Sequence, residues 1–368
     1  MLLIGQFNYT TTLRYSFPQE DETPNLKDLK LPHKFVELSL ASLHSIRGRL
    51  LQVEAENFLT TSNEFEDRTN AIQVKVDSLS AHLTPLKPIK DNTPIVAVDV
   101  SSVKLGETDV GVLCAVRGAI VWSIERKYSY LRIGPFPFHV TEENFNNISR
   151  LLKVYNFLSS GICRLEDIQN KLSNLVERWL QMSVCSMSYG NIILLDGSLT
   201  VGTPDNPLLV LRNILEEARK RENKVLAISK MTGIRILGRR ITDLVSRYPP
   251  PCLFKVNELK RYSATSIRIL GDVYIAKLAE GFSAFRLDID KGLSGKESLN
   301  AVRRLLGNDI VYQGYPETLR LAHILSTFTA SEVIGVQHYL AHKYNLRVIA
   351  RPSVRKILFG PYGTRLEN

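Results

Sequence analysis

Two acidic residues directly follow apolar segments, at the places where buried strands are expected to end. In the segment NIILLDGSLT, residues 191–200, a run of apolar residues leads to Asp196, and Gly197 and Ser198 follow it. In the segment PIVAVDVSS, residues 94–102, another apolar run leads to Asp99. Because Asp-Gly is also a common turn dipeptide, Asp196 is either a functional carboxylate or a turn-forming residue.

Two carboxylates held a few ångströms apart could bind a divalent cation. Like charges raise each other's pKa, and a cation between them removes the repulsion. Oxygen ligands with open coordination positions favour Mg²⁺ or Mn²⁺. Two such ions roughly 3.5–4 Å apart can activate a water molecule and stabilise the leaving oxygen of a phosphodiester. If Asp99 and Asp196 lie side by side, the chain is therefore a candidate nuclease.

A third acidic ligand is expected from the helix that precedes Asp196. The segment RLEDIQNKLSNLVERWLQMS, residues 164–183, repeats apolar residues at helical spacing. It offers three carboxylates, Glu166, Asp167 and Glu177. Glu177 is expected near the end of this helix, at the opposite edge of the sheet from Asp196 unless the helix lies obliquely. Position alone does not choose among the three, and each could equally be a solvated helix carboxylate.

The order of the predicted elements brings the two aspartates together. Three strands are expected within residues 94–133, with a hairpin at Gly118 joining the second and third. The helix of residues 164–183, the strand that ends at Asp196, a helix over 205–223 and a strand over 224–230 follow. A hairpin meander followed by crossovers gives a mixed sheet covered by helices, and the expected fold class is α/β with a ribonuclease H-like core. In that arrangement the first and fourth strands are neighbours, which places Asp99 beside Asp196.

Composition favours a globular protein that binds a polyanion. The 368 residues carry a net charge of +10, and no apolar run approaches the roughly 18 residues that span a membrane. We therefore expect a cytoplasmic protein without membrane association. The four cysteines form no CxxC pair, so neither a disulfide framework nor a zinc site is indicated. The positive charge favours nucleic acid as the partner, and the absence of a Walker motif excludes a P-loop ATPase.

Three regions are expected along the chain. Residues 1–90 form an N-terminal region that is helical, with a long amphipathic helix over residues 33–57 available for dimerisation. Residues 91–330 form the ribonuclease H-like domain, and residues 331–368 form a helical and basic C-terminal extension.

Four segments in this order resemble the NurA family of archaeal and bacterial DNA-repair nucleases. They are VAVDVSS, ERWL followed by NIILLDGSL, VLAISK and GYPETLRLAH, and they lie within residues 94–326. The resemblance implies a ribonuclease H-like core, a requirement for Mn²⁺ or Mg²⁺, and degradation of DNA. It also implies a homodimer that works with the hexameric translocase HerA at broken DNA ends.

The resemblance also assigns residues. It implies that Asp99, Glu177, Asp196 and His323 are metal ligands and that Tyr315 and Lys230 complete the catalytic group. Glu177 is thereby chosen over Glu166. The hydroxyl of Tyr315 would orient His323 or its ring would stack on a base, and the alternative is a packed aromatic residue. The first motif departs from the family's Asp-Gly-Ser, because Val100 stands in place of glycine and could hinder close approach of metal or phosphate.

The leading hypothesis is thus a metal-dependent deoxyribonuclease. The resemblance implies a 5′–3′ exonuclease and single-strand endonuclease that resects DNA ends during double-strand break repair. The alternative is a nuclease-like scaffold that binds DNA or the HerA motor without cutting, and a ribonuclease follows only from the expected core fold. Basic clusters in the second half of the chain predict phosphate contacts by Arg235, Arg239, Arg240 and Lys260.

Overall fold

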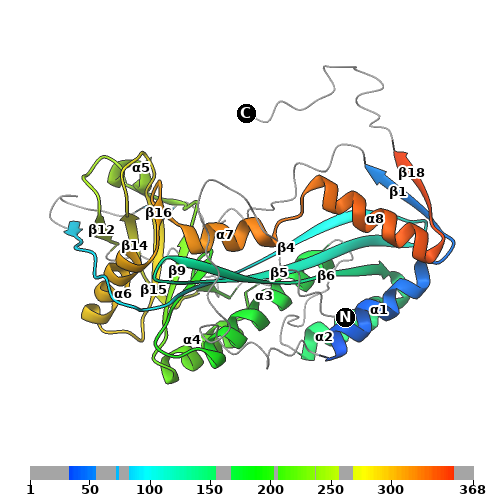
Figure 1. Ribbon diagram of the computed structural model, residues 1–368, viewed down its shortest axis with the longest axis horizontal. Helices are drawn as coiled ribbons and strands as arrows, with labels where there is room; N and C mark the ends of the chain where they lie inside the picture. Colours follow the sequence, from blue (N-terminus) through cyan, green and yellow to red (C-terminus); the bar gives the residue numbers. More distant parts are fainter. Residues whose placement is uncertain are drawn as a thin grey trace, which may run out of the picture.

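An 11-stranded mixed sheet runs through the molecule and is covered by helices on both faces (Figure 1). The computed structural model describes residues 33–54, 72–73, 83–154, 167–202, 206–236, 238–256 and 268–351. The main path of strands across the sheet is β18-β1-β4-β7-β9-β15-β14-β12-β3, and β5 and β6 branch from β4. None of the helices in these ranges is long and apolar enough to cross a membrane.

Five central strands have the strand order of ribonuclease H, β6-β5-β4-β7-β9. The β4–β5 and β5–β6 pairs are antiparallel, whereas β4–β7 and β7–β9 are parallel. Their bounds are β4 Ile95–Glu107, β5 Gly111–Ile124, β6 Lys127–Thr141, β7 Ile192–Asp196 and β9 Lys224–Ser229. The predicted fold class is confirmed.

The register of the parallel pair places the two aspartates next to each other. Ile95 to Val98 of β4 pair with Ile192 to Leu195 of β7, so Asp99 and Asp196 follow at the same level. Strand β7 ends at Asp196, while β4 continues to Glu107, where it pairs with β1. The edge of β4 just beyond Asp99 therefore faces no β7 residue, and the carboxylates lie where the parallel pairing stops.

The hairpin expected at Gly118 is wrong. Gly118 lies inside β5, and the chain reverses at Glu125 and Arg126, which have φ angles of 52° and 62°. A Cβ atom at position 118 would lie only 2.5 Å from Cδ1 of Leu180 in the covering helix. Glycine at this position therefore permits close helix–sheet packing and does not form a turn.

Helices pack on both faces of the central strands. Alternate residues of β4 and β7 point to opposite faces: Val96 and Val98 pack into the core beneath α3 and α4, and Ile95 and Ala97 into the core beneath α6 and α7. Figure 1 shows α3 and α4 on one side of the sheet and α7 on the other. The bounds of these helices and of α2 are α2 Glu142–Val154, α3 Ile168–Met187, α4 Leu208–Lys220, α6 Gly295–Asn308 and α7 Glu317–Ser326.

The N- and C-terminal parts of the described chain pair with each other at one end of the sheet. Strand β1 (Leu50–Glu54) pairs in parallel with β18 (Arg347–Arg351), next to helix α8 (Ala330–Tyr344). The long helix predicted over residues 33–57 is consequently wrong over residues 47–54: α1 spans His33–Ser42, a 3₁₀ turn spans Leu43–Ile46, and the chain then turns at Gly48, with φ 72°, into β1. Residues 55–57 lie outside the described residues. Pairing with β18 outweighs the helical periodicity of these residues.

The other end of the molecule is a smaller lobe with its own apolar cluster (Figure 1). Ile234, Ile241, Phe254, Ile275 and Ala284 belong to this cluster. The remaining elements are β2 Ile72–Gln73, β3 Leu83–Pro85, β8 Thr200–Val201, β10 Ile234–Ile236, β11 Arg239–Arg240, α5 Ile241–Val245, β12 Cys252–Lys255, β13 Arg268–Ile269, β14 Gly271–Lys277, β15 Phe285–Asp290, β16 Val311–Tyr312 and β17 Tyr315–Pro316.

The described cysteines lie in the interior of the protein. Cys114, Cys185 and Cys252 are buried free thiols, and Cys163 lies outside the described residues.

An ion-pair cluster fixes the junction between α7 and α8. Glu332, in the first turn of α8, accepts hydrogen bonds from the guanidinium groups of Arg117 (3.0 Å) and Arg132 (2.6 Å). Arg117 also stacks on Phe328, 4.1 Å from the ring centroid. Burial alone would raise the pKa of Glu332, but hydrogen bonds from the Thr329 backbone and the two arginines lower that pKa to about 2.

Replacement Glu332→Gln should lower the free energy of unfolding at pH 7 by about 1–3 kcal/mol, because two charged hydrogen bonds weaken. A carboxylate with a lowered pKa stabilises the fold above its unfolded value near 4.5 and loses this contribution as the pH falls toward 2. The deficit of the variant should therefore shrink between these values in urea unfolding measured at several pH values. The exposed Glu280 provides the control, since Glu280→Gln should change the free energy by less than about 0.5 kcal/mol at each pH. A deficit independent of pH would contradict the assignment.

Candidate active site

Asp99, Asp196 and His323 form one cluster at the edge where β7 ends. One potential ligand atom of each residue lies within 4.8 Å of the others. His323 Nδ1 is 3.2 Å from Asp99 Oδ2 and 3.9 Å from Asp196 Oδ2. The aspartates come from adjacent parallel strands, whereas His323 comes from α7, which packs on the face of the sheet to which both carboxylates point. Parallel pairing and helix packing thus assemble residues that are far apart in the sequence.

The electrostatics of the cluster show an excess of negative charge. Burial, together with the neighbouring Asp99 carboxylate, raises the pKa of Asp196, although Lys230 and His323 oppose this shift. The hydrogen bond to Asp99 raises the pKa of His323. Burial disfavours the charged form of Asp196, and a cation bound beside this carboxylate would favour its ionised form.

Lys230 and Tyr315 border the cluster, and their catalytic roles stay a prediction. Strand β9 lies parallel to β7, so Lys230, the residue after β9, emerges at the same edge as Asp196. The ammonium group of Lys230 is 3.2 Å from Asp196 Oδ2 and 5.9 Å from the ring centroid of Tyr315. The Tyr315 ring in turn packs edge-to-face on Phe285, with centroids 5.4 Å apart.

Glu177 approaches from the other face of the sheet. Helix α3 runs to Met187, so Glu177 lies in its middle and not near its end. Gln169 at the start of α3 donates to Ser102 of β4 (3.2 Å). Glu177 lies eight residues after Gln169, about 12 Å along the helix, and Asp99 lies three residues before Ser102, about 10 Å along β4. Glu177 is therefore level with Asp99.

The charge on Glu177 is coupled to the two aspartates. Burial raises the pKa of Glu177 to about 7, and Asp99 and Asp196 add to this shift. Its Oε1 atom accepts a hydrogen bond from Gln181 (2.7 Å), and Glu177 is not one of the three residues whose ligand atoms lie within 4.8 Å of one another. Its role as a metal ligand stays a prediction. Asp167 lies just before α3, and Glu166 lies outside the described residues.

The residues present fit a hard divalent cation. Two carboxylates and one imidazole provide oxygen and nitrogen donors, and the raised pKa of Asp196 indicates negative charge that a cation would neutralise. The alternative role of Asp196, formation of a turn, receives less support. The Gly197 N–H donates to the carbonyl of Ile228 (2.9 Å) in the neighbouring strand β9, and the Asp196 carboxylate faces Lys230 and His323.

Ser326 and Ser101 orient Asp99, and sequence reasoning missed both. The Ser326 hydroxyl donates to Asp99 Oδ2 at 2.5 Å, and Ser101 donates to the Ser326 carbonyl at 2.6 Å. Ser326 lies three residues after His323, so both side chains project from the same face of α7. The spacing of three residues between His323 and Ser326 is the feature of the sequence that could have indicated the role of Ser326.

A buried ion pair holds the loop that follows Asp196. The Arg286 guanidinium donates two 2.8 Å hydrogen bonds to the Asp288 carboxylate, and both side chains are almost completely inaccessible to solvent. Asp288 also accepts the N–H of Leu199 (3.0 Å), and Arg286 donates to the Thr200 hydroxyl (3.2 Å). The signal for this pair was an arginine and an aspartate two residues apart in the apolar strand FRLDID, which places them on one face.

Val100 does not cover the carboxylates. As the next residue of β4, it points to the face opposite Asp99 and packs against the core beneath α3. One of its methyl groups is 3.5 Å from the position that a Cβ of Gly118 would occupy, close to Leu180. The departure from the family's glycine is therefore accommodated by helix packing.

Three of the predicted phosphate-contacting residues lie on or between the short strands β10 and β11. Arg235 pairs directly with Arg240 across this hairpin, and Arg239 and Arg240 are exposed. Like charges directly opposite each other on two strands repel, so an anion between them would be stabilising. Lys260 lies outside the described residues.

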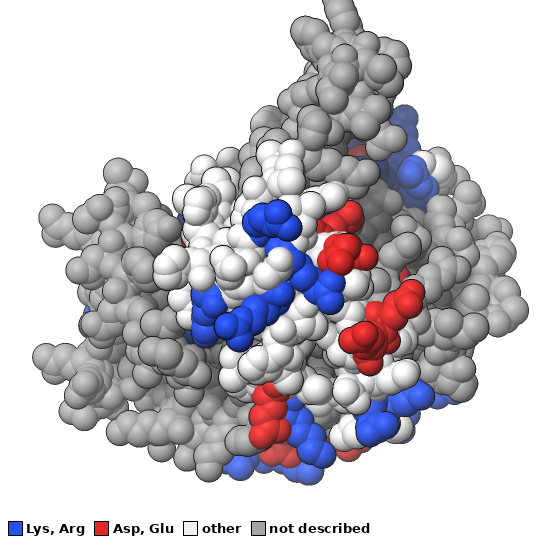
Figure 2. All heavy atoms as spheres, turned by 90° about the vertical axis from the view of Figure 1, so that its right-hand side faces the viewer, with Lys and Arg blue, Asp and Glu red and all other residues white. Residues whose placement is uncertain are grey.

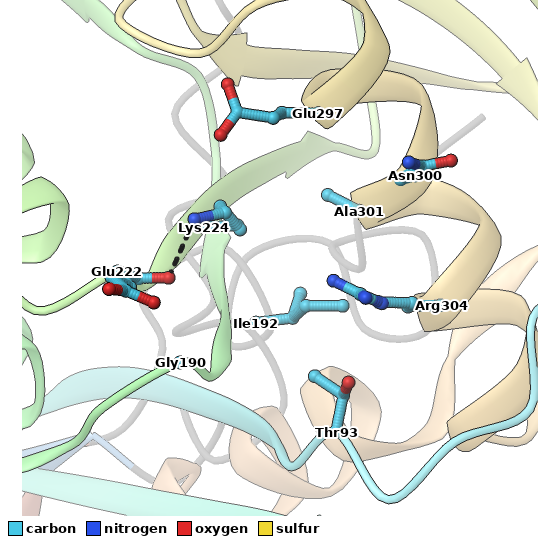
Figure 3. A pocket seen from close by; sticks show the side chains of 9 residues that line it. All are labelled: Thr93, Gly190, Ile192, Glu222, Lys224, Glu297, Asn300, Ala301 and Arg304. Atoms are coloured by element: carbon cyan, nitrogen blue, oxygen red, sulfur yellow. Dashed lines mark hydrogen bonds between the residues drawn. The ribbon is translucent and has the colours of Figure 1, made fainter.

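A polar pocket of about 240 Å³ lies at the opposite edge of the sheet from the aspartates. It is lined at the starts of β7 and β9 by Ile192 and Lys224, and by Arg304 of α6 (Figure 3). Lys224 donates to the main-chain oxygen of Glu222 (2.8 Å), and Glu222 and Glu297 balance the basic side chains. Ile192 in the pocket lies four strand residues, or about 13 Å, from Asp196, so the pocket is separate from the acidic cluster.

Comparisons with known proteins identify the family of the chain. A family model for the NurA domain matches residues 93–326. The NurA nuclease from Sulfolobus solfataricus is 19% identical, with 73% of this chain and 89% of that chain covered and a TM-score of 0.48. Endonuclease V from Ciona intestinalis, solved with DNA containing an inosine, is 12% identical over 72% of this chain and 92% of that chain, with a TM-score of 0.35. No curated protein matches the chain.

The replacement Asp288→Asn should destabilise the protein by about 3–5 kcal/mol, because it leaves the Arg286 charge buried without its partner. Urea unfolding at pH 7 measures this loss. Asp272→Asn on the adjacent strand β14 is the matched control: its partly exposed pair with Lys255, 3.5 Å long, should contribute less than about 1 kcal/mol. Equal losses in the two variants would show that Asp288 does not hold the loop.

Proposed function

Because the chain belongs to the NurA family of nucleases, we propose that it hydrolyses the phosphodiester bonds of DNA in a reaction that depends on Mn²⁺ or Mg²⁺. The observation that carries the proposal is the cluster of Asp99, Asp196 and His323 at an edge of the sheet where the β4–β7 pairing stops. Two carboxylates and an imidazole lie in one group there, together with the Lys230 ammonium 3.2 Å from Asp196, and such groups of titratable side chains are typical of functional sites.

Each residue of the cluster has a distinct part in the proposal. Asp99 and Asp196 would hold the divalent cation together with His323 and Glu177, and the bound cation would supply Lewis-acid stabilisation of the phosphate. Ser326 fixes one oxygen of Asp99, which leaves the other directed away from this hydrogen bond. Lys230, 3.2 Å from Asp196, places a positive charge beside the position of the phosphate. Tyr315 lies beside Lys230, with its ring centroid 5.9 Å from the ammonium group.

The β10–β11 hairpin would contact the DNA backbone. Arg235 and Arg240 face each other there, and Arg239 is exposed beside them. The opposite end of the molecule is different: Figure 2 shows basic and acidic side chains close together on its described surface. Two surface ion pairs, Arg49–Asp109 (2.8 Å) and Lys104–Glu107 (2.5 Å), involve residues of this end. The lobe that carries β10 and β11 is thus the better surface for a polyanion.

The finer functional assignments rest on the family resemblance. We propose a 5′–3′ exonuclease and single-strand endonuclease that acts in DNA end resection during double-strand break repair. We also propose a homodimer around a basic passage for DNA, coupled to a HerA-type hexameric ATPase in the cytoplasm. A scaffold without nuclease activity is the competing hypothesis, and Val100 was its motivation. The packing of Val100 on the face opposite Asp99 favours the enzyme.

Asp196→Asn should abolish cleavage, on the order of 10³-fold or more, because the side chain keeps its shape but loses the charge that holds the cation. Cleavage of end-labelled single-stranded DNA with Mn²⁺, Mg²⁺ or a chelator measures this loss. Asp99→Asn should behave alike, and the double variant should be scarcely worse, since groups acting as one unit are not additive. The exposed Asp272→Asn is the control. Normal cleavage by Asp196→Asn combined with a lower melting temperature would identify a turn-forming carboxylate and contradict the proposal.

Arg239→Ala and Arg240→Ala should each weaken DNA binding regardless of sequence and reduce the slope of log K against log salt by about one unit. Titration of labelled DNA at several salt concentrations, with a chelator present to prevent cleavage, measures this slope. Arg47→Ala provides the control, because Arg47 is an exposed arginine near α1, at the opposite end of the molecule. If both variants have the same slope as the parent protein, Arg239 and Arg240 are solvated surface residues without contact to DNA, which would contradict the proposal.

A further inference from the structure

Two aromatic side chains are exposed at the tips of neighbouring turns in the smaller lobe. Phe282, between β14 and β15, is 100% exposed, and Tyr312, at the end of β16, is 61% exposed. A single exposed aromatic residue needs no explanation, but two on adjacent turns form an apolar surface that gains stability only when it is covered.

The two turns lie against each other. A Cβ atom at Gly281 would be 3.9 Å from the Cα of Gln313, and one at Gly314 would be 3.2 Å from the carbonyl oxygen of Ser283. Gly281, Gln313 and Gly314 have φ angles of 124°, 49° and 86°, so both reversals are tight. Phe282 and Tyr312 therefore lie on two turns that contact each other.

A continuous chain of contacts leads from these tips to the acidic cluster. Tyr312 pairs with Tyr315 across the β16–β17 hairpin, and the Tyr315 ring packs against Phe285 just after the Phe282 turn. Lys230 lies between the Tyr315 ring and Asp196, 5.9 Å from the ring centroid and 3.2 Å from Asp196 Oδ2. The exposed aromatic pair is thus at the border of the candidate active site.

Basic residues lie on the same structural unit as the aromatic pair. Ala284, two residues after Phe282, packs in one apolar cluster with Ile234 and Ile236 of β10, the strand that pairs with exposed Arg239 and Arg240. Aromatic faces beside a basic surface are suited to an unpaired nucleic-acid strand, because every base can stack on a ring while the phosphates meet the arginines. A duplex offers no free base faces.

We propose that Phe282 and Tyr312 form a stacking site for unpaired bases of single-stranded DNA on its way to the Asp99–Asp196 cluster. This inference rests on the proposed function and names the form of DNA that the site accepts. The bases stack on the two rings, and the backbone passes the β10–β11 arginines and Lys230.

The test is binding of an oligonucleotide that carries 2-aminopurine, whose fluorescence is quenched by stacking, with a chelator present. Phe282→Ala and Tyr312→Ala should each weaken binding of single-stranded DNA by about 5- to 100-fold and reduce the quenching. Binding of a blunt duplex and the salt dependence should stay the same, because the phosphate contacts remain. Phe282→Trp should restore both affinity and quenching.

Tyr189→Ala is the matched control, since Tyr189 is 63% exposed and lies beside Gly190, at the opposite edge of the sheet. Unchanged affinity and quenching in both alanine variants would overturn the stacking site, and the nuclease proposal would still stand. An equal loss for duplex DNA would also overturn it. A change in molecular mass by light scattering, with DNA binding intact, would show instead that the surface contacts protein and would overturn it too. A parent protein that quenches 2-aminopurine but cuts no DNA would support the stacking site and contradict only the nuclease.

Discussion

The parallel pairing of β4 with β7 is the constraint on which the rest of the site depends. Four residue pairs, from Ile95–Ile192 to Val98–Leu195, fix the register, and the next residue on each strand is an aspartate. The apolar strands are buried against helices on both faces, so the stability of the core holds the two carboxylates together. Burial, and then the neighbouring Asp99 carboxylate, raise the pKa of Asp196. Core packing therefore supplies the free energy that holds the two carboxylates next to each other.

The neighbours of the carboxylates fix their positions from several directions. Ser326 and His323 approach Asp99 from α7, while Lys230 approaches Asp196 from the end of β9. The Arg286–Asp288 pair holds the backbone after Asp196. The Glu332 cluster fixes the chain just after Ser326. Each contact joins segments distant in the sequence, so the geometry of the cluster depends on the whole sheet and its covering helices.

The molecule has two parts with different surfaces, one on each side of the carboxylates, and the long strand β4 extends into one of them. Beyond Asp99 it continues through Glu107 and pairs with β1, at the end that also contains α1, α8 and β18. On the other side of β9, strands β15, β14 and β12 extend the sheet into the smaller lobe. The exposed arginines of β11 and the aromatic turns belong to that lobe, whereas basic and acidic side chains are mixed at the β1 end (Figure 2). The carboxylates lie between the two parts.

The sequence by itself determined that two buried apolar segments each lead to an aspartate. This is a local property, because an apolar run records burial within a few residues. The strand order came from analogy with the ribonuclease H fold, and the predicted strand end at Asp99 is wrong, because β4 continues to Glu107 in its pairing with β5. His323, Lys230 and Tyr315 were assigned through family resemblance; the structure places His323 and Lys230 within 4 Å of Asp196, and Tyr315 beside Lys230. The physical pattern alone did not indicate this, because their proximity depends on how α7 and β17 return to the sheet.

Only the tertiary structure decided the remaining features. Gly118 reads locally as a turn, yet it lies inside a strand because Leu180 of α3 packs where its side chain would be. Residues 50–54 read as helix, yet they form a strand because β18, almost 300 residues later, pairs with them. Ser326, Arg286 and Asp288 acquire their roles from partners that the fold supplies. Local periodicity reports which face of an element is buried, but not which distant residue covers it, and that choice is made by packing between elements.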